Sequence, residues 1–188
     1  MTADTGTLVR LTNGIDIERV DAVGQALLRD PQQARMQVRV TSTWDEGMRS
    51  TTKVQPLDAG GAPLPQTFSL RSDEPDQLGG SGSGPTPFDL LLAALNSCML
   101  VGYAYRATQA GLQIRRITIE ADCDLDMRGF FGDETVPPGC RVVRQMVKIE
   151  GDGTAADWLQ IHRKVQATSP IYHSLTNPVR VETTLEVG

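Results

Sequence analysis

The sequence is poor in the residues and patterns that mark several kinds of site. It has two histidines, three cysteines and 5% aromatic residues. No CxxC pair occurs, and neither His162 nor His173 stands at a ligand spacing, so we expect no metal and no cofactor. No Gly-x-Ser-x-Gly motif precedes a helix, which leaves a serine hydrolase without support. The net charge of -5 without a basic run excludes nucleic acid as an expected partner.

Targeting and membrane signals are also lacking. The first residues carry no positive region followed by an apolar run, from which we expect a cytoplasmic protein. The most apolar stretch, Leu90 to Tyr105, is shorter than the roughly 20 residues that a bilayer needs and contains Asn96 and Ser97. It predicts a buried core helix rather than a membrane span. The odd, irregularly spaced cysteines fit a reducing compartment better than a disulfide framework.

What remains is an ordinary globular composition. The chain has 188 residues, of which 39% are hydrophobic and 22% charged. A chain of this size buries about 70% of its unfolded surface, which allows one substantial core. We expect a helical extension over residues 1–35 and a main domain over residues 36–188.

The apolar spacing predicts the elements before the central helix. Ile15 to Asp30 has a helical period and ends at a proline. Met36 to Trp44 alternates with period 2, as a half-buried strand does, and Asp45-Glu46-Gly47 supplies a turn. Arg49 to Val54 and Gln66 to Arg71 are two further predicted strands of an antiparallel meander.

The central helix has the clearest start. Thr86 and Asp89 form a predicted capping box around Pro87, and Gly111 is the expected stop after about Ala110. The elements expected after it are two strands, a helix capped by Thr154 and a last strand, with bounds 117–127, 142–149, 155–167 and 179–187. The order is α-βββ-α-ββ-α-β, an α+β fold. A helix that is apolar on nearly every side needs sheets on more than one face, so we expect a homodimer.

The segment from Gly84 to Cys98, GPTPFDLLLAALNSC, resembles the cysteine helix of the OsmC/Ohr superfamily of osmotically inducible and organic hydroperoxide resistance proteins. Asp73-Glu74-Pro75, Gly79-Gly80 and the segment from Ser169 also resemble that family. The resemblance implies antiparallel sheets wrapped around a long buried helix in an intertwined homodimer. It also implies a stress-response oxidoreductase in which Cys98 reduces organic hydroperoxides.

Thiol peroxidase chemistry needs a thiolate and a group that favours it. A free thiol is mostly protonated at pH 7, and an arginine favours the thiolate without titrating itself. The resemblance asks for an arginine on the N-terminal hairpin, where Arg49 is the candidate and Arg39 its rival. Relatives use a glutamate to orient that arginine, but Phe88 stands at this position, with Asp89 one residue later as either an orienting group or a cap.

The sulfenic acid that forms on Cys98 must also be resolved. Ser169 stands where relatives often have the resolving cysteine, so Cys123, Cys140 or an external thiol would have to act. A small core residue is the plainer interpretation of Cys123 and Cys140. Phe130 and Phe131 either line a pocket for an apolar peroxide or fill core. The alternative function is a non-catalytic protein of the same fold that binds an apolar or thiol-containing small molecule.

Overall fold

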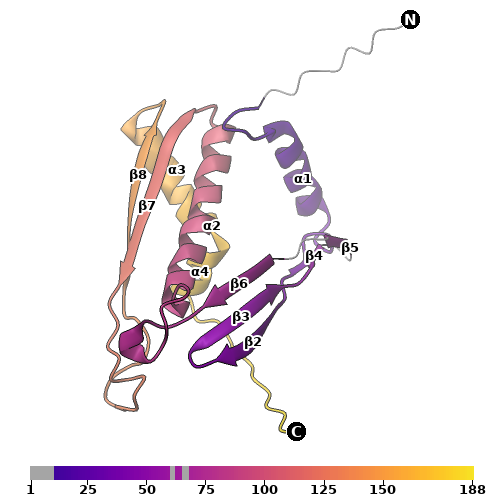
Figure 1. The fold of residues 1–188 in the computed structure, drawn as a ribbon. Helices are drawn as coiled ribbons and strands as arrows, with labels where there is room; N and C mark the ends of the chain where they lie inside the picture. The colour runs from indigo at the N-terminus through magenta and orange to yellow at the C-terminus, as the bar shows by residue number, and fades with distance from the viewer. Residues whose placement is uncertain (1–10, 60–61, 65–67) are drawn as a thin grey trace, which may run out of the picture. The chain divides into compact units, whose positions relative to one another are not determined.

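The computed structural model describes residues 11–59, 62–64 and 68–188. Two compact units can be distinguished, one ending at Leu91 and the other beginning at Leu92. The long helix α2 (Pro87–Gln109) passes from the first unit into the second (Figure 1). Each unit is described separately below.

The first unit contains one helix and two small antiparallel sheets. Helix α1 (Ile17–Arg29) begins where Asp16 accepts a hydrogen bond from the Arg19 N–H and ends at Asp30, as its apolar period predicts. The strands are β1 (Met36–Gln37), β2 (Val40–Glu46), β3 (Arg49–Val54), β4 (Leu57–Ala59), β5 (Ala62–Leu64) and β6 (Phe68–Ser72). Their orders are β2-β3-β6 and β1-β4-β5.

Two sequence predictions need correction in this unit. The strand predicted over Met36 to Trp44 is two strands, because β1 pairs with β4 whereas β2 pairs with β3. The short hairpin of β4 and β5 was not predicted, since its three-residue strands are too short for an alternation to show. Residues 66 and 67 of the predicted third strand lie outside the described residues, and the first ten residues of the predicted extension do as well.

The loop that leads into α2 is organised by one buried carboxylate. After the short 3-10 helix η1 (Asp76–Leu78), both the N–H and the hydroxyl of Ser81 and Ser83 donate to Asp73, at 2.7 to 3.1 Å. The Glu74 N–H adds a fifth bond at 2.8 Å. These donors, with the Ser81 hydroxyl as the largest cause, hold the pKa of Asp73 far below its usual value of 3.8. The Gly-rich stretch is therefore ordered, although its composition predicts flexibility.

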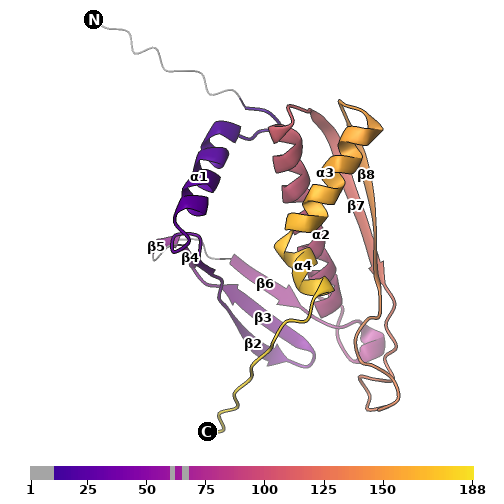
Figure 2. The ribbon, with the colours of Figure 1, turned by 180° about the vertical axis from the view of Figure 1, so that it is seen from behind.

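The second unit packs helices on one face of a hairpin. Strands β7 (Ile114–Cys123) and β8 (Val143–Gly151) pair antiparallel, with Ile119 opposite Val147 and Cys123 opposite Val143. Helices α3 (Ala155–Thr168) and α4 (Pro170–Thr176) follow, and α3 begins at the predicted cap Thr154, which forms a capping box with Asp157. Both helices and the later turns of α2 lie on the same side of the hairpin (Figures 1 and 2).

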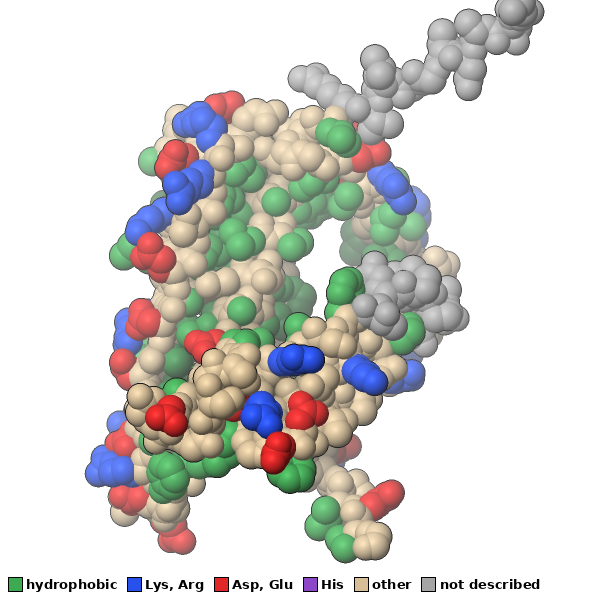
Figure 3. Space-filling view, viewed as in Figure 1, with side chains coloured by type: hydrophobic (Ala, Val, Ile, Leu, Met, Phe, Trp, Pro, Cys, Tyr) green, Lys and Arg blue, Asp and Glu red, His purple; other side chains and the backbone are tan. Residues whose placement is uncertain are grey.

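The core of this unit is small. Leu95, Met99, Tyr103 and Ala107 recur every four residues on α2, and all are buried against Ile161 and Val165 of α3. Other side chains of α2 are half-buried or exposed, such as Val101 at 71%, which differs from the expectation of a helix that is covered on nearly every side within one chain. By length and composition α2 is also apolar enough to cross a membrane, a test that the core helix of a soluble protein passes as well. In Figure 3 apolar side chains reach the surface over α2.

The last predicted strand does not form within the chain. Residues 178–188 follow α4 without a ladder partner, as the trace to the C-terminus shows in Figure 2. The side chains of Val179, Val181, Leu185 and Val187 are 60 to 86% exposed. The residues alternate with period 2, but alternation alone does not form a strand unless a neighbouring strand pairs with it.

Candidate functional site

A close contact between α2 and α3 sets the geometry around Cys98. Gly102 has no side chain, and a Cβ atom built there would lie 2.9 Å from Cγ1 of Val165. Val165 is fully buried and β-branched, so it has little freedom to move aside. One helical turn before Gly102 stands Cys98, and one turn after Val165 stands Ser169. The crossing therefore brings Cys98 and Ser169 together.

The Ser169 hydroxyl donates to Sγ of Cys98 over 3.1 Å. Its oxygen also accepts a bond from the Tyr172 N–H over 3.3 Å, as the N-cap of α4. A hydroxyl has one proton, and because its oxygen accepts from the backbone, that proton is left for the sulfur. Ser169 is buried and Cys98 half-buried. Cys98, the predicted nucleophile, thus has a fixed hydrogen-bond donor in Ser169, the residue that the family resemblance places at the position of the resolving cysteine.

Asp89 is committed to the start of α2. The N–H and the hydroxyl of Thr86 both donate to its carboxylate, at 2.8 and 2.7 Å, and the Asp89 N–H donates back to Thr86. These bonds, led by that of the Thr86 hydroxyl, lower the pKa of Asp89. The structure shows the capping alternative for this residue. Phe88 beside it is half-buried.

Arg49 begins β3 in the first unit. Its guanidinium forms an ion pair with Glu46 across the turn at Gly47, with 3.0 Å between Nη2 and Oε2. Gly47 has a φ of +59°, which the turn requires and glycine adopts without strain. The guanidinium is therefore neutralised in part by a carboxylate that the sequence analysis did not consider. Its rival Arg39 donates to the Gln37 side chain.

Phe130 and Phe131 are surface residues of the loop between β7 and β8. Their exposed fractions are 67% and 72%, and their rings meet edge to face with centroids 5.2 Å apart. They fill neither core nor cavity in the single chain. The other two cysteines lie at the base of this loop, where the Cys123 thiol interacts directly with that of Cys140.

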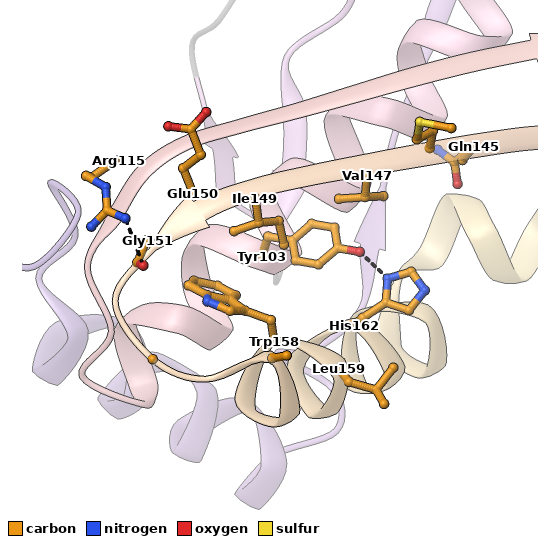
Figure 4. Close-up of a pocket in the computed structure, with 13 residues that line it drawn as sticks. Tyr103, Arg115, Gln145, Val147, Ile149, Glu150, Gly151, Trp158, Leu159 and His162 are labelled. Atoms are coloured by element: carbon orange, nitrogen blue, oxygen red, sulfur yellow. Dashed lines mark hydrogen bonds between the residues drawn. The ribbon is translucent and has the colours of Figure 1, made fainter.

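A cavity of about 870 Å³ lies between β8 and α3, away from Cys98. Apolar side chains including Val147, Ile149 and Trp158 line it, and buried Tyr103 forms its floor (Figure 4). The Tyr103 hydroxyl is hydrogen-bonded to Nδ1 of His162. Burial raises the pKa of Tyr103 to about 12. His162 is half-buried, and its ring satisfies this buried hydroxyl.

No pattern in the sequence predicted this cavity. The four-residue spacing that places Tyr103 in the core after Leu95 and Met99 was available as a signal, but the spacing of His162 on α3 did not reveal its partner. Among the residues that the structure describes, no group of three or more histidine, cysteine or acidic side chains is arranged to hold a metal ion.

Comparisons with known proteins agree with this fold. The family model for OsmC-like proteins matches residues 80–184, so the chain belongs to the OsmC-like protein family. No curated protein matches the chain.

Solved structures are similar in fold at low identity. An OsmC-like protein from Mycoplasma pneumoniae has a TM-score of 0.57 and 14% identity, over 74% of this chain and 87% of its own. A protein from Psychrobacter arcticus, described as an osmotic stress induced and detoxification response protein, has a TM-score of 0.55 and 19% identity, over 72% and 85%. An OsmC-like protein of unknown function from Vibrio cholerae has a TM-score of 0.54 and 15% identity, over 73% and 92%.

Proposed function

We propose that this protein is a thiol-dependent reductase of organic hydroperoxides with Cys98 as its nucleophile. The observation that carries the proposal is the hydrogen bond of 3.1 Å from the buried Ser169 hydroxyl to the Cys98 sulfur. A fixed donor favours a thiolate over a thiol, because the charged sulfur accepts the stronger hydrogen bond. Membership of the OsmC-like family adds support for a cysteine at this place in the helix.

The proposed reaction has two stages. The Cys98 thiolate attacks one peroxide oxygen, the O–O bond breaks, and the alkoxide leaves and takes up a proton as an alcohol. Cys98 retains the other oxygen as a sulfenic acid. An external thiol then attacks the sulfenic sulfur and releases water, and a second thiol reduces the mixed disulfide to free Cys98 and a small disulfide.

The external thiol follows from the side chain at position 169. Serine cannot form a disulfide, and its hydroxyl is already the neighbour of Cys98. The Cys123 thiol, one of the two alternatives, has Cys140 as its partner. We therefore assign resolution to a small thiol in a reducing cytoplasm.

The remaining residues of the proposal have weaker support. Arg49 is the proposed activator of the thiolate. This role requires that its guanidinium leave the ion pair with Glu46 and pair with the Cys98 thiolate instead. The exposed Phe130 and Phe131 are proposed to contact the apolar part of a hydroperoxide once a second subunit covers them. Replacing Arg49 with Ala tests the first role through the rate of Cys98 alkylation, which should fall.

We also propose that the working form is a homodimer. Large apolar side chains are exposed in each unit, among them Val40 at 57% and Trp44 at 70% in the first and Val101 at 71% in the second, and a second subunit would cover them. The unpaired segment 178–188 alternates as a strand does. Sedimentation equilibrium should give twice the chain mass of 20.4 kDa, and a monomer at micromolar concentration would contradict the proposal.

The experiment on activity measures consumption of an organic hydroperoxide with a dithiol reductant. The wild-type protein should turn over, and Cys98→Ser should lose all activity above background. Cys123→Ser is the matched control, since it removes a thiol of the same unit and should keep the rate. Equal background rates for wild type and Cys98→Ser would overturn the proposal.

A second candidate function is binding of a small apolar molecule, which the cavity between β8 and α3 favours. Trp158 lines that cavity and serves as its fluorescent reporter. A hydrophobic probe should quench Trp158 equally in wild type and Cys98→Ser if the cavity binds independently of the thiol. Quenching by the probe without any peroxide turnover would favour this function over the first.

A further inference from the structure

Cys123 and Cys140 meet at the base of the loop between β7 and β8. Cys123 is the last residue of β7 and lies opposite Val143, the first residue of β8. Cys140 precedes Val143 by three residues, so it stands where the chain returns to the hairpin. The Cys140 thiol lies near enough to raise the pKa of the Cys123 thiol, and both cysteines are free and half-buried.

The loop itself holds the two cysteines near each other. Gly129 packs so closely on the later part of the loop that a Cβ atom there would lie 2.6 Å from the Val136 carbonyl oxygen and 2.9 Å from Pro138. The Asp133 N–H donates to the Arg128 carbonyl over 2.9 Å, and the Phe131 N–H to that of Met127 over 3.1 Å. The loop is folded back on itself rather than extended. Its two ends therefore approach each other without the need for a covalent link.

Charged groups surround Cys123 closely. Asp122 and Asp124 flank it, and Arg144 bridges both carboxylates, with 2.7 Å from Nε to Asp122 and 2.8 Å from Nη1 to Asp124. Burial, then Cys140, then these two carboxylates raise the pKa of the Cys123 thiol. A raised pKa leaves Cys123 mainly as the thiol at neutral pH, which slows its reaction with a reagent in solution.

We infer that Cys123 and Cys140 form a second redox site, independent of Cys98, which a small disulfide oxidises to an intramolecular disulfide across the base of the loop. The inference rests on the hairpin register that places Cys123 opposite Val143, three residues after Cys140, on the folded loop between the two cysteines and on the partial exposure of both. It does not depend on the reaction proposed for Cys98.

The chemistry is thiol–disulfide exchange in two steps. The Cys140 thiolate attacks one sulfur of the small disulfide, the S–S bond breaks, and one small thiol leaves with a proton. The Cys123 thiolate then attacks the Cys140 sulfur of the mixed disulfide and expels the second small thiol. The protein dithiol is oxidised by two electrons, the small disulfide is reduced to two thiols, and the protons of Cys123 and Cys140 pass to these products.

The consequence of the bond is a closed ring that contains the loop with Phe130 and Phe131. A disulfide that closes a loop of this size restricts the unfolded chain. We expect the oxidised protein to melt about 5 °C higher than the reduced protein. The amides of the loop should also exchange more slowly with solvent.

The test uses the full chain with Cys98→Ser, so that only the pair remains. Oxidised glutathione at dilute protein concentration should give a monomeric chain product that is lighter by two hydrogen atoms and loses both titratable thiols together. Peptide mapping should join 123 to 140. In the two controls, Cys98→Ser with Cys123→Ala and Cys98→Ser with Cys140→Ala, the remaining thiol should instead keep a glutathione adduct.

Two outcomes would overturn the inference. One is a stable glutathione adduct on the chain that retains both cysteines, because a neighbouring thiol would have displaced it. The other is a link between two chains rather than within one. Circular dichroism of each variant shows that the fold is retained, and a failure of peroxide turnover in the wild-type protein leaves this test unaffected.

Discussion

The two cysteine neighbourhoods of this protein differ in what stands beside the sulfur. Cys98 lies on a helix and has a neutral hydroxyl donor, held by helix packing at Gly102 and by the cap of α4. Cys123 ends a strand and has a second thiol and two carboxylates around it. A hydroxyl donor favours the thiolate, whereas negative charge and burial oppose it. The neighbouring groups thus favour different chemistry at two otherwise similar thiols.

The substitution with the largest expected effect is Ser169→Cys, which gives Cys98 a neighbouring thiol, as Cys123 has. The two side-chain atoms now lie 3.1 Å apart, and a bond length of about 2.05 Å is within reach of a small rotation. After one equivalent of peroxide, a disulfide between positions 98 and 169 should replace the sulfenic acid. Trapping of sulfenic acid with dimedone should fall more than about tenfold. Unchanged trapping would show that the two positions separate during the reaction.

Gly102→Ala tests the packing that creates the Cys98 neighbourhood. The new methyl group would overlap Val165, so we expect a loss of about 1 to 3 kcal/mol in the free energy of unfolding, measured by urea denaturation. Peroxide turnover should fall as well, because Ser169 is displaced from Cys98. Gly24→Ala on α1 is the matched control, since nothing lies within 4 Å of its Cβ position. There the alanine should stabilise the helix by about 0.5 to 1 kcal/mol.

Ser169→Ala removes only the donor. We expect a loss of about 1 kcal/mol in stabilisation of the thiolate, which corresponds to roughly fivefold slower alkylation of Cys98 at neutral pH. Ser169→Thr retains a hydroxyl and should restore most of the rate. Equal alkylation rates for Ser169→Ala and wild type would mean that the hydrogen bond contributes only to packing.

The smallest expected effect is that of Asp124→Asn on Cys123. The raised pKa of this thiol means that its alkylation accelerates only as the pH rises beyond 9.0, the usual value. Removal of one negative neighbour should move this acceleration to lower pH, by an amount limited by solvent screening. Rates measured by mass spectrometry from pH 7 to 10 give the profile. A shift to higher pH would contradict the assigned cause.

The sequence predicted those features that short-range chemistry decides. The capping box of Thr86 and Asp89 predicted the start of α2, and the cap residue Thr154 predicted the start of α3, because helix caps are local patterns. The site was predicted in part. The family resemblance placed Cys98 at the position of the nucleophile and Ser169 at that of the resolving cysteine, and the structure brings their side chains into contact. The ion pair of Arg49 with Glu46 was not predicted, since a turn brings it about.

Other features depend on contacts that no local pattern shows. The approach of Cys140 to Cys123 requires the loop between them to fold, which neither the spacing of the two cysteines nor the phenylalanines reveal. The bond from Tyr103 to His162 likewise joins two helices that are far apart in sequence. The strand predicted over residues 179–187 is wrong for the single chain, because the period-2 pattern does not reveal whether a neighbouring strand pairs with it.

The buried Asp73 gives the protein a form of acid tolerance. Its pKa is lowered in the folded state, so its contribution to stability is present above the unfolded value of 3.8 and is lost only as the pH falls through the much lower folded value. At any pH above the unfolded value the carboxylate stays ionised, and Ser81 and Ser83 keep their acceptor. The entrance to the cysteine helix would then remain ordered in a cell whose pH is dropping.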